Sequence, residues 1–289
     1  LPALADDDEM DRLSARGFAT GYAGGGIALM LVIAAVYWHE QLGLSRQEAT
    51  RLGFVFTGVW WLLFALPTLT LLTKRYAPEQ RQAAVQGIKG YLQTYAEIRK
   101  YRDLSVFLLA FFLYNDGLQT LIVVTGIFAR ETLGFPRFTI LLCLLMVQFT
   151  AMPCTLLFGW LAGRIGNKRA LLLSLILLFA AAGYAFVLDE IWEFWALAAV
   201  VALAFGGTQA ISRSLYGTMI PPGKNAEFYG FYSISGRFAS IFGPLTFGLI
   251  TDITDSARYG VAAVSLFFAA GMALLLKVDV HRAQSSRQT

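Results

Sequence analysis

Long stretches without a charged residue alternate along this chain with short charged clusters. Six stretches of at least 18 residues contain no Asp, Glu, Lys or Arg: residues 17–39, 52–73, 138–163, 170–188, 194–212 and 259–276. Two more, residues 104–129 and 228–251, are each interrupted by one charge, Asp116 and Arg237 respectively. About 20 apolar residues in a helix cross a hydrocarbon core roughly 30 Å thick, and these stretches lack the polar–apolar alternation of membrane β-strands. The pattern therefore predicts an all-α membrane protein with eight transmembrane helices.

The composition agrees with this prediction and argues against a soluble domain. Hydrophobic residues make up 57% of the chain and charged residues 15%, whereas about 25% of residues are charged in ordinary soluble domains. In water, a chain this apolar would expose larger apolar patches than soluble monomers tolerate. The apolar stretches therefore predict a lipid bilayer around the protein. The net charge of +4 is modest and does not by itself indicate nucleic acid, and we expect no nucleic acid as a partner.

The basic residues indicate which side of the membrane each segment faces. If the N-terminus is cytoplasmic, 17 of the 23 Lys and Arg residues fall in inner segments and five in outer segments, with Arg237 inside a span. Cytoplasmic loops are enriched in Lys and Arg. We therefore expect both ends of this chain on the cytoplasmic side.

The longest connection, residues 74–103, is polar and basic and separates two spans from six. We interpret it as a central cytoplasmic linker with an amphipathic helix on the membrane surface. A nucleic-acid patch is the alternative for this basic stretch. The six following spans occupy residues 104–278, and residues 279–289 are expected to form a cytoplasmic tail.

One polar stripe interrupts the third span. Asn115 and Gln119 are four residues apart, as are Asp116 and Thr120, so each pair stacks on one side of a helix. Gly117 is expected to weaken this helix, and broken helices in mid-membrane commonly line substrate sites. Because a charged residue inside a membrane costs about 2.5–3.5 kcal/mol, we predict that Asn115, Asp116 and Gln119 lie on a substrate or proton pathway.

Asp116 and Arg237 lie at similar depths, about 18 and 15 Å from the inner ends of their spans at about 1.5 Å per residue. This similarity predicts a salt bridge between them. Our functional hypothesis is that Asp116 takes and releases a proton during a transport cycle, with Arg237 tuning its acidity. The alternative is a permanent buried pair that only fixes helix packing.

Other positions inside the spans allow both a functional and a structural interpretation. Gln148 and Gln209 either bind the polar part of a solute or bond to a neighbouring helix, which contributes about 0.6 kcal/mol on average. Three prolines are expected to kink or end their helices, and a glycine run favours close helix packing. These residues are Pro67, Pro153 and Pro244, and Gly24, Gly25 and Gly26.

The connection between the fourth and fifth spans carries small and basic residues, namely Gly159, Arg164, Gly166, Lys168 and Arg169. Small residues let two helices approach before a tight turn, and basic residues favour a helix C-terminus and the cytoplasmic face. The segment resembles the cytoplasmic signature loop of the major facilitator superfamily, Gly-x-Leu-Ala-Asp-Arg-x-Gly-x-basic-basic. Gly163 stands where that pattern has Asp, so the loop serves either as an altered charge relay or as a structural turn.

Longer segments narrow the resemblance to one family. Residues 111–120 (FFLYNDGLQT), 207–214 (GTQAISRS), 227–232 (EFYGFY) and 60–67 (WWLLFALP) are similar to the vacuolar effluxers linked to autophagy and to their bacterial "unknown major facilitator" relatives. The resemblance covers nearly the whole chain. It implies the major facilitator fold with twelve spans in a bacterial inner membrane, the third and seventh predicted spans here corresponding to the seventh and eleventh of the fold.

Eight of those twelve spans are present in this chain, so the resemblance places four others before Leu1, which agrees with the absence of an initiator Met. Residues 1–73 would then hold the last two helices of the N-terminal bundle, and residues 104–278 the C-terminal six-helix bundle. We therefore expect the missing N-terminal helices of the same protein to be a partner of this chain.

The resemblance implies a secondary transporter that moves a small solute by alternating access, with amino acid efflux as the expected activity and protons as the candidate coupling ion. A carrier of sugars or drug-like solutes is an alternative. A non-transporting sensor or scaffold on a transporter fold is another. The sequence contains no hydrolase or metalloprotease motif and no Cys/His cluster. We therefore expect no enzyme activity, catalytic residue, metal or cofactor.

Overall fold

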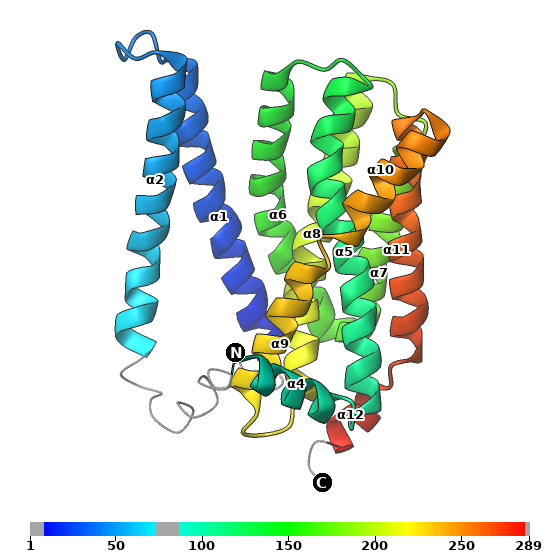
Figure 1. The fold of residues 1–289 in the computed structure, drawn as a ribbon. Coiled ribbons are helices and arrows are strands. Elements are labelled where there is room, and N and C mark those ends of the chain that lie inside the picture. The colour runs from blue at the N-terminus through cyan, green and yellow to red at the C-terminus, as the bar shows by residue number, and fades with distance from the viewer. Residues whose placement is uncertain (1–8, 73–86, 287–289) are drawn as a thin grey trace.

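The computed structural model describes residues 9–72 and 87–286 (Figure 1). The regular structure of these residues is helical throughout, which confirms the predicted all-α class. The helices are α1 (Met10–Tyr37), α2 (Arg46–Pro67), the π-helical turn η1 (Thr68–Leu72), α4 (Gly87–Ile98), α5 (Arg102–Glu131), α6 (Arg137–Ile165), α7 (Asn167–Tyr184), α8 (Ile191–Met219), α9 (Asn225–Phe238), α10 (Phe242–Thr254), α11 (Ala257–Lys277) and α12 (Val280–Ser286).

Seven of the described helices are long and apolar enough to cross a membrane: α1, α2 with its extension to Leu71, α5, α6, α7, α8 and α11. The seventh predicted span, residues 228–251, is not one helix, in agreement with the expectation that Pro244 kinks or ends its helix. It consists of α9 and α10, which together run between the two ends of the bundle (Figure 1). The described residues therefore cross eight times, once through a broken helix.

Prolines account for two of the helix ends. Pro244 is the third residue of α10. It has no N–H to donate, and its ring collides with the carbonyl four residues earlier in a continuous helix, so the break falls just before it. Pro67 ends α2, and a π-helical turn follows. Pro153 lies inside α6, which continues to Ile165.

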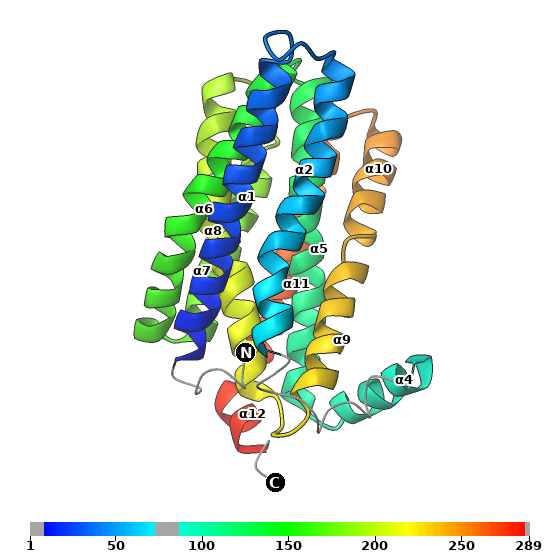
Figure 2. The same ribbon diagram turned by 90° about the vertical axis from the view of Figure 1, so that its left-hand side faces the viewer.

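Helices α5 to α11 form one bundle, and α1 and α2 lie on one side of it (Figures 1 and 2). We call the end where α1 begins and α11 ends the lower end, as drawn in Figure 1. Helix α1 packs along α6 and also contacts α8. Helix α2 lies beside α1 and exposes large apolar side chains, among them Phe54 and Trp61, each with about three quarters of its surface free (75% and 74%). Such a surface suits lipid or further helices of the same protein.

Small residues bring α1 and α6 into close contact. A Cβ added to Gly159 would lie 2.5 Å from the Cβ of Ala15, and one added to Gly25 would lie 2.9 Å from Nε2 of Gln148. Gly26 is similarly close to the ring of Phe149, at 3.3 Å. Close packing at the glycine run is therefore confirmed for Gly25 and Gly26.

The linker contains one described helix, α4, which lies across the lower end against α9 (Figures 1 and 2). The ring of Tyr91 stacks on that of Phe231 with the centroids 4.8 Å apart. Lys224, just before α9, forms a 2.6 Å ion pair with Glu97. The hydrogen bond to Glu97 holds the pKa of Lys224 above its ordinary value. Helix α4 is thus attached to the broken crossing.

Candidate functional site

The break between α9 and α10 faces the polar stripe of α5. Residues 239–241 form the turn between the two half-helices, so the first N–H groups of α10 have no partner within their own helix. Gly243, near the start of α10, has no room for a side chain. A Cβ there would lie 1.8 Å from Oγ1 of Thr120 and 3.0 Å from Oδ1 of Asp116. Glycine therefore allows α10 to touch the stripe directly.

Asp116 is fully buried at the start of α10. Its Oδ1 accepts a 2.9 Å hydrogen bond from the backbone N–H of Gly243, whereas its Oδ2 has no hydrogen-bond partner among the described residues. The start of a helix carries a partial positive charge and free N–H groups, which favour a carboxylate. A buried polar atom without a partner costs about 1–3 kcal/mol. Oδ2 is thus a buried acceptor that has no partner among the described residues.

Asn115, the neighbour of Asp116, connects three helices through its side-chain amide. Its Nδ2 donates a 3.0 Å hydrogen bond to the carbonyl of Gly236 in α9. Its Oδ1 accepts a 3.0 Å hydrogen bond from Nε2 of Gln209 in α8. The structure thereby brings together Asn115, Asp116 and Gln209, three of the residues that the sequence predicted for the pathway. We call these three residues the polar site.

The predicted salt bridge between Asp116 and Arg237 is not formed, and that prediction is wrong. Arg237 is exposed, and within the described ranges its side chain makes no ion pair. Gly236 is the residue of α9 that faces α5, where its carbonyl binds Asn115. Successive residues of a helix point about 100° apart, so Arg237 is turned away from Asp116.

Gly117 does not weaken α5 as expected, because α5 continues without interruption from Arg102 to Glu131. A Cβ on Gly117 would lie 3.0 Å from the Cβ of Phe267 and 3.2 Å from the ring of Phe268. The glycine therefore permits close packing against α11. The break that the sequence suggested for this region lies in the facing helix.

The remaining predicted amides do not join the polar site. Gln119 is half-buried and makes no hydrogen bond with another described residue. Gln148 of α6 faces Gly25 of α1 and lines a separate cavity of about 270 Å³ between α5, α6 and α8. Apolar side chains such as Leu121 and Phe205 form most of its wall. Gln148 thus belongs to an apolar cavity.

The signature loop is a tight turn between α6 and α7. Gly166 has a φ of +89°, a conformation that favours glycine. The guanidinium of Arg164 lies 4.1 Å from the centre of the Trp160 ring. Gly163 is exposed, with open space around it. These features describe a tight turn between two helices at the lower end.

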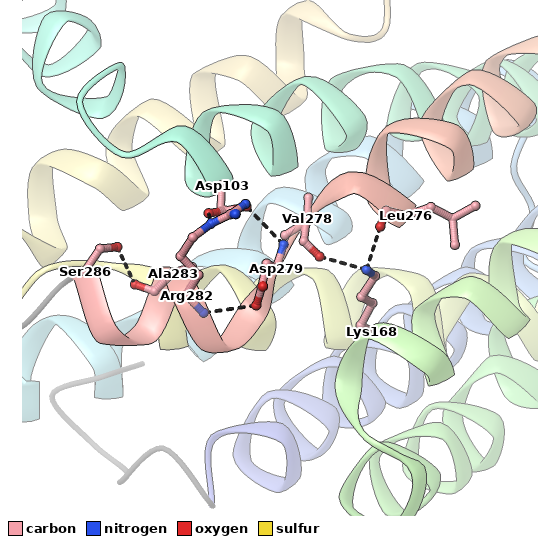
Figure 3. A network of polar contacts seen from close by, with 8 residues as sticks. All are labelled: Asp103, Lys168, Leu276, Val278, Asp279, Arg282, Ala283 and Ser286. Atoms are coloured by element: carbon pink, nitrogen blue, oxygen red, sulfur yellow. Dashed lines mark hydrogen bonds and ion pairs between the residues drawn. The ribbon is translucent and has the colours of Figure 1, made fainter.

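Lys168 joins this loop to the end of α11. Its ammonium donates hydrogen bonds of 2.9 Å to the carbonyl of Leu276 and 2.7 Å to that of Val278 (Figure 3). Carbonyls at the end of a helix lack intrahelical donors, so a lysine there stabilises the helix end. Arg169 is exposed and makes no hydrogen bond to another described side chain or backbone group.

Asp11 is a residue of this region that sequence reasoning missed. Its Oδ1 accepts a 2.9 Å hydrogen bond from Nδ2 of Asn167 in the signature loop and a short one from the hydroxyl of Ser214 in α8. One turn along α1, Ser14 donates a 2.7 Å hydrogen bond to the carbonyl of Ala210. A carboxylate at the loop is thus supplied by α1. The position of Asp11 at the first turn before a charge-free stretch was a weak signal for such a role.

A chain of hydroxyl groups behind the polar site was also missed. Tyr114 Oη lies 2.6 Å from Oγ of Ser212, which donates to the carbonyl of Thr208. The hydroxyl of Thr208 donates to Oγ of Ser174 in α7 at 2.9 Å. All four side chains are buried. Their small size hides them in an apolar pattern, and together they connect α5, α8 and α7.

Comparisons with known proteins bear on this architecture. A family model described as "Vacuole effluxer Atg22 like" matches residues 3–288. The uncharacterized MFS-type transporter YxiO of Bacillus subtilis (strain 168) is 34% identical over 278 residues, which cover 95% of this chain and 65% of that protein. Autophagy-related protein 22-1 of Aspergillus niger is 29% identical, with 94% of this chain and 47% of that protein covered.

A solved structure has a similar fold. A bacterial homologue of the iron transporter ferroportin, crystallised in an outward-facing state, superposes with a TM-score of 0.61 at 14% identity. The match covers 96% of this chain and 65% of that structure. At this identity the similarity concerns the fold alone. The chain spans 47% to 65% of the length of the relatives and of the structure compared here.

Proposed function

The chain belongs to the Atg22-like vacuole effluxer family of major facilitator transporters, and we propose that it is part of a secondary carrier that exports an amino acid by alternating access. In this proposal the polar site receives the solute and Asp116 carries a coupling proton. The remaining helices of the carrier come from the same protein, whose relatives are longer than this chain.

The polar site at the helix break is the observation that supports this proposal most. Strongly polar side chains are costly inside a membrane and need a reason to be there. Asn115 and Asp116 are at most 3% exposed, and Asp116 is an acidic residue buried inside the bundle. They lie where a crossing is interrupted, and interrupted helices commonly form the binding sites of secondary carriers.

The amides of the polar site match the two ends of a zwitterion. Oδ1 of Asn115 accepts a hydrogen bond from Gln209 and has a second lone pair for an ammonium group. Nε2 of Gln209 has a second N–H, which can donate to a carboxylate. An amino acid could therefore bind both amides through its own charged groups.

Asp116 is proposed to couple proton occupancy to the position of α10. As a carboxylate it is held by the N–H of Gly243 and by the partial positive charge at the start of the half-helix. A proton on Oδ2 removes the negative charge and weakens this attraction. Protonation would thus release α10 from α5, and deprotonation would restore the contact.

Two other functions have observations in their favour. The apolar cavity of about 270 Å³ beside Gln148 would suit a sugar or drug-like solute only if its ring or tail is largely apolar. The hydrogen bond between Asp116 and Gly243 would also serve a fixed structural role in a non-transporting sensor or scaffold. Transport measurements separate these possibilities.

The test uses the full-length protein in liposomes that contain a labelled amino acid mixture. We expect efflux of particular amino acids to depend on an imposed proton gradient, and Asp116→Asn to abolish this dependence. Asp252→Asn is the matched control, because Asp252 is an exposed carboxylate on α10 itself. Gradient-dependent efflux by Asp116→Asn equal to that of the control would exclude the proton-carrying role, and no efflux of any amino acid would exclude the substrate class.

A further inference from the structure

A second cavity, which has a largely polar lining, lies at the lower end, away from the polar site. It has a volume of about 900 Å³ and is bounded by the signature loop, the end of α11 and α12. Figure 3 shows part of its wall, where Lys168 of α7 and Arg282 of α12 approach the end of α11. Arg169 and Lys277 line the same cavity. Four basic residues thus line one cavity.

The acidic groups near this cavity are already bound. Asp11 accepts hydrogen bonds from Asn167 and Ser214. Asp103, whose side chain is 7% exposed, forms two 2.6 Å hydrogen bonds with the guanidinium of Arg282. The side chain of Asp279 accepts the 3.0 Å hydrogen bond from the backbone N–H of Arg282. Of these contacts, the ion pair with Asp103 uses the charge of Arg282, whereas the donors to Asp11 and Asp279 are uncharged groups.

Two cations remain without an anionic partner. The side chains of Arg169 and Lys277 are exposed and form no ion pair or hydrogen bond within residues 9–72 and 87–286. The ammonium of Lys168 uses two of its three N–H groups on carbonyls and has one left. The cavity therefore offers two free cations and one further donor, which suits an anion with several oxygen acceptors.

The depth of the cavity indicates where that anion comes from. Ile165, the last residue of α6, and Leu276, next to the last residue of α11, both line it. Their side chains are exposed, at 37% and 62%. The cavity thus begins where the apolar spans end, at the level of lipid headgroups. Basic pockets at this level between transmembrane helices bind anionic headgroups.

We propose that this cavity binds the phosphate of an anionic phospholipid headgroup, with Arg169 and Lys277 as its cationic contacts and Lys168 as an additional donor. Ile165 and Leu276 then lie beside the first methylene groups of the acyl chains. The bound lipid would join the signature loop to the end of α11 and to α12. This inference does not depend on which solute is transported.

The test measures the thermal stability of the purified full-length protein in detergent, because a ligand that binds the folded state raises the unfolding midpoint with concentration. The probes are dioctanoyl phosphatidylglycerol, dioctanoyl phosphatidylcholine and inorganic phosphate. We expect stabilisation by phosphatidylglycerol and at least about tenfold weaker binding in Arg169→Gln/Lys277→Gln, from the typical strength of charge-assisted hydrogen bonds. Arg130→Gln/Arg137→Gln is the matched control, since it removes two charges near the upper end of α5 and α6.

A variant that is expected to bind more tightly shows whether weaker binding in the double variant results from loss of folding. Gln284 lines the cavity, and Gln284→Lys should tighten binding of phosphatidylglycerol. Equal stabilisation by inorganic phosphate would support the phosphate site and identify a soluble anion as its ligand. The proposal is overturned if phosphatidylcholine stabilises as well as phosphatidylglycerol, or if the lower-end double variant binds as tightly as the upper-end control.

Discussion

Replacing Gly243 by alanine is expected to separate α10 from α5. The added Cβ would lie 1.8 Å from Oγ1 and 2.9 Å from Cβ of Thr120, and 3.0 Å from Oδ1 of Asp116. Rotation of the hydroxyl cannot relieve the contact with the Thr120 Cβ, so the backbone of α10 has to move. The hydrogen bond from the Gly243 N–H to Asp116 is then lengthened or lost.

The expected loss of stability in Gly243→Ala is the sum of two contributions. Overpacking by one methyl group costs about 1–3 kcal/mol, and losing a hydrogen bond to a charged group costs about 1.5–3 kcal/mol. We expect Gly243→Ala to lower the free energy of unfolding by about 3 kcal/mol or more, measured by equilibrium unfolding in mixed micelles. Gly248→Ala on the same half-helix is the control, because its Cβ meets nothing within 4 Å. If both variants unfold at the same denaturant concentration, the close contact between α10 and α5 is not present in solution.

Three further changes test other contacts. Gly159→Ala should destabilise the packing of α1 on α6 by about 1–3 kcal/mol, whereas Gly163→Ala, with open space around it, should leave the unfolding midpoint unchanged. Asn115→Ala leaves two hydrogen-bond partners unpaired and should cost about 1–3 kcal/mol; an unchanged midpoint would argue against the three-helix connection. Because the pKa of Lys224 is raised by its hydrogen bond to Glu97, this contact should stabilise the protein below about pH 10.4 and lose its effect as the pH rises through the raised pKa. A pH titration of stability for wild type and Lys224→Gln should therefore converge at high pH, and parallel curves would contradict the assignment.

The crossings of the chain could be predicted because hydropathy and length determine them directly. Hydropathy and length could not locate the break, because residues 228–251 form one stretch interrupted only by Arg237. The sequence contained its cause, Pro244, but a proline also lies within the continuous helix α6. Whether a proline ends a helix depends on what can bind the freed backbone groups, and here Asp116 does so from α5.

The polar stripe was predictable from its spacing, but its partners were not. Similar depth in the membrane favoured Arg237 as the partner of Asp116. The direction in which a side chain points around its helix depends on helix packing, which depth alone does not predict. The contacts of Asp11 join residues 156 and 203 positions apart in the chain. No local pattern predicts such a contact, because the approach of α1 to α8 is a property of the assembled bundle.

The measurement that tests the proton-carrying role of Asp116 most directly compares two modes of transport in the same liposomes. Solute exchange at equal concentrations on both sides requires binding and conformational change, but no net proton movement. Gradient-driven efflux requires the proton as well. We expect Asp116→Asn in the full-length carrier to retain exchange and to lose gradient-driven efflux. Retention of both would contradict a proton-carrying role for Asp116, and loss of both would instead assign it to the structure of the helix break.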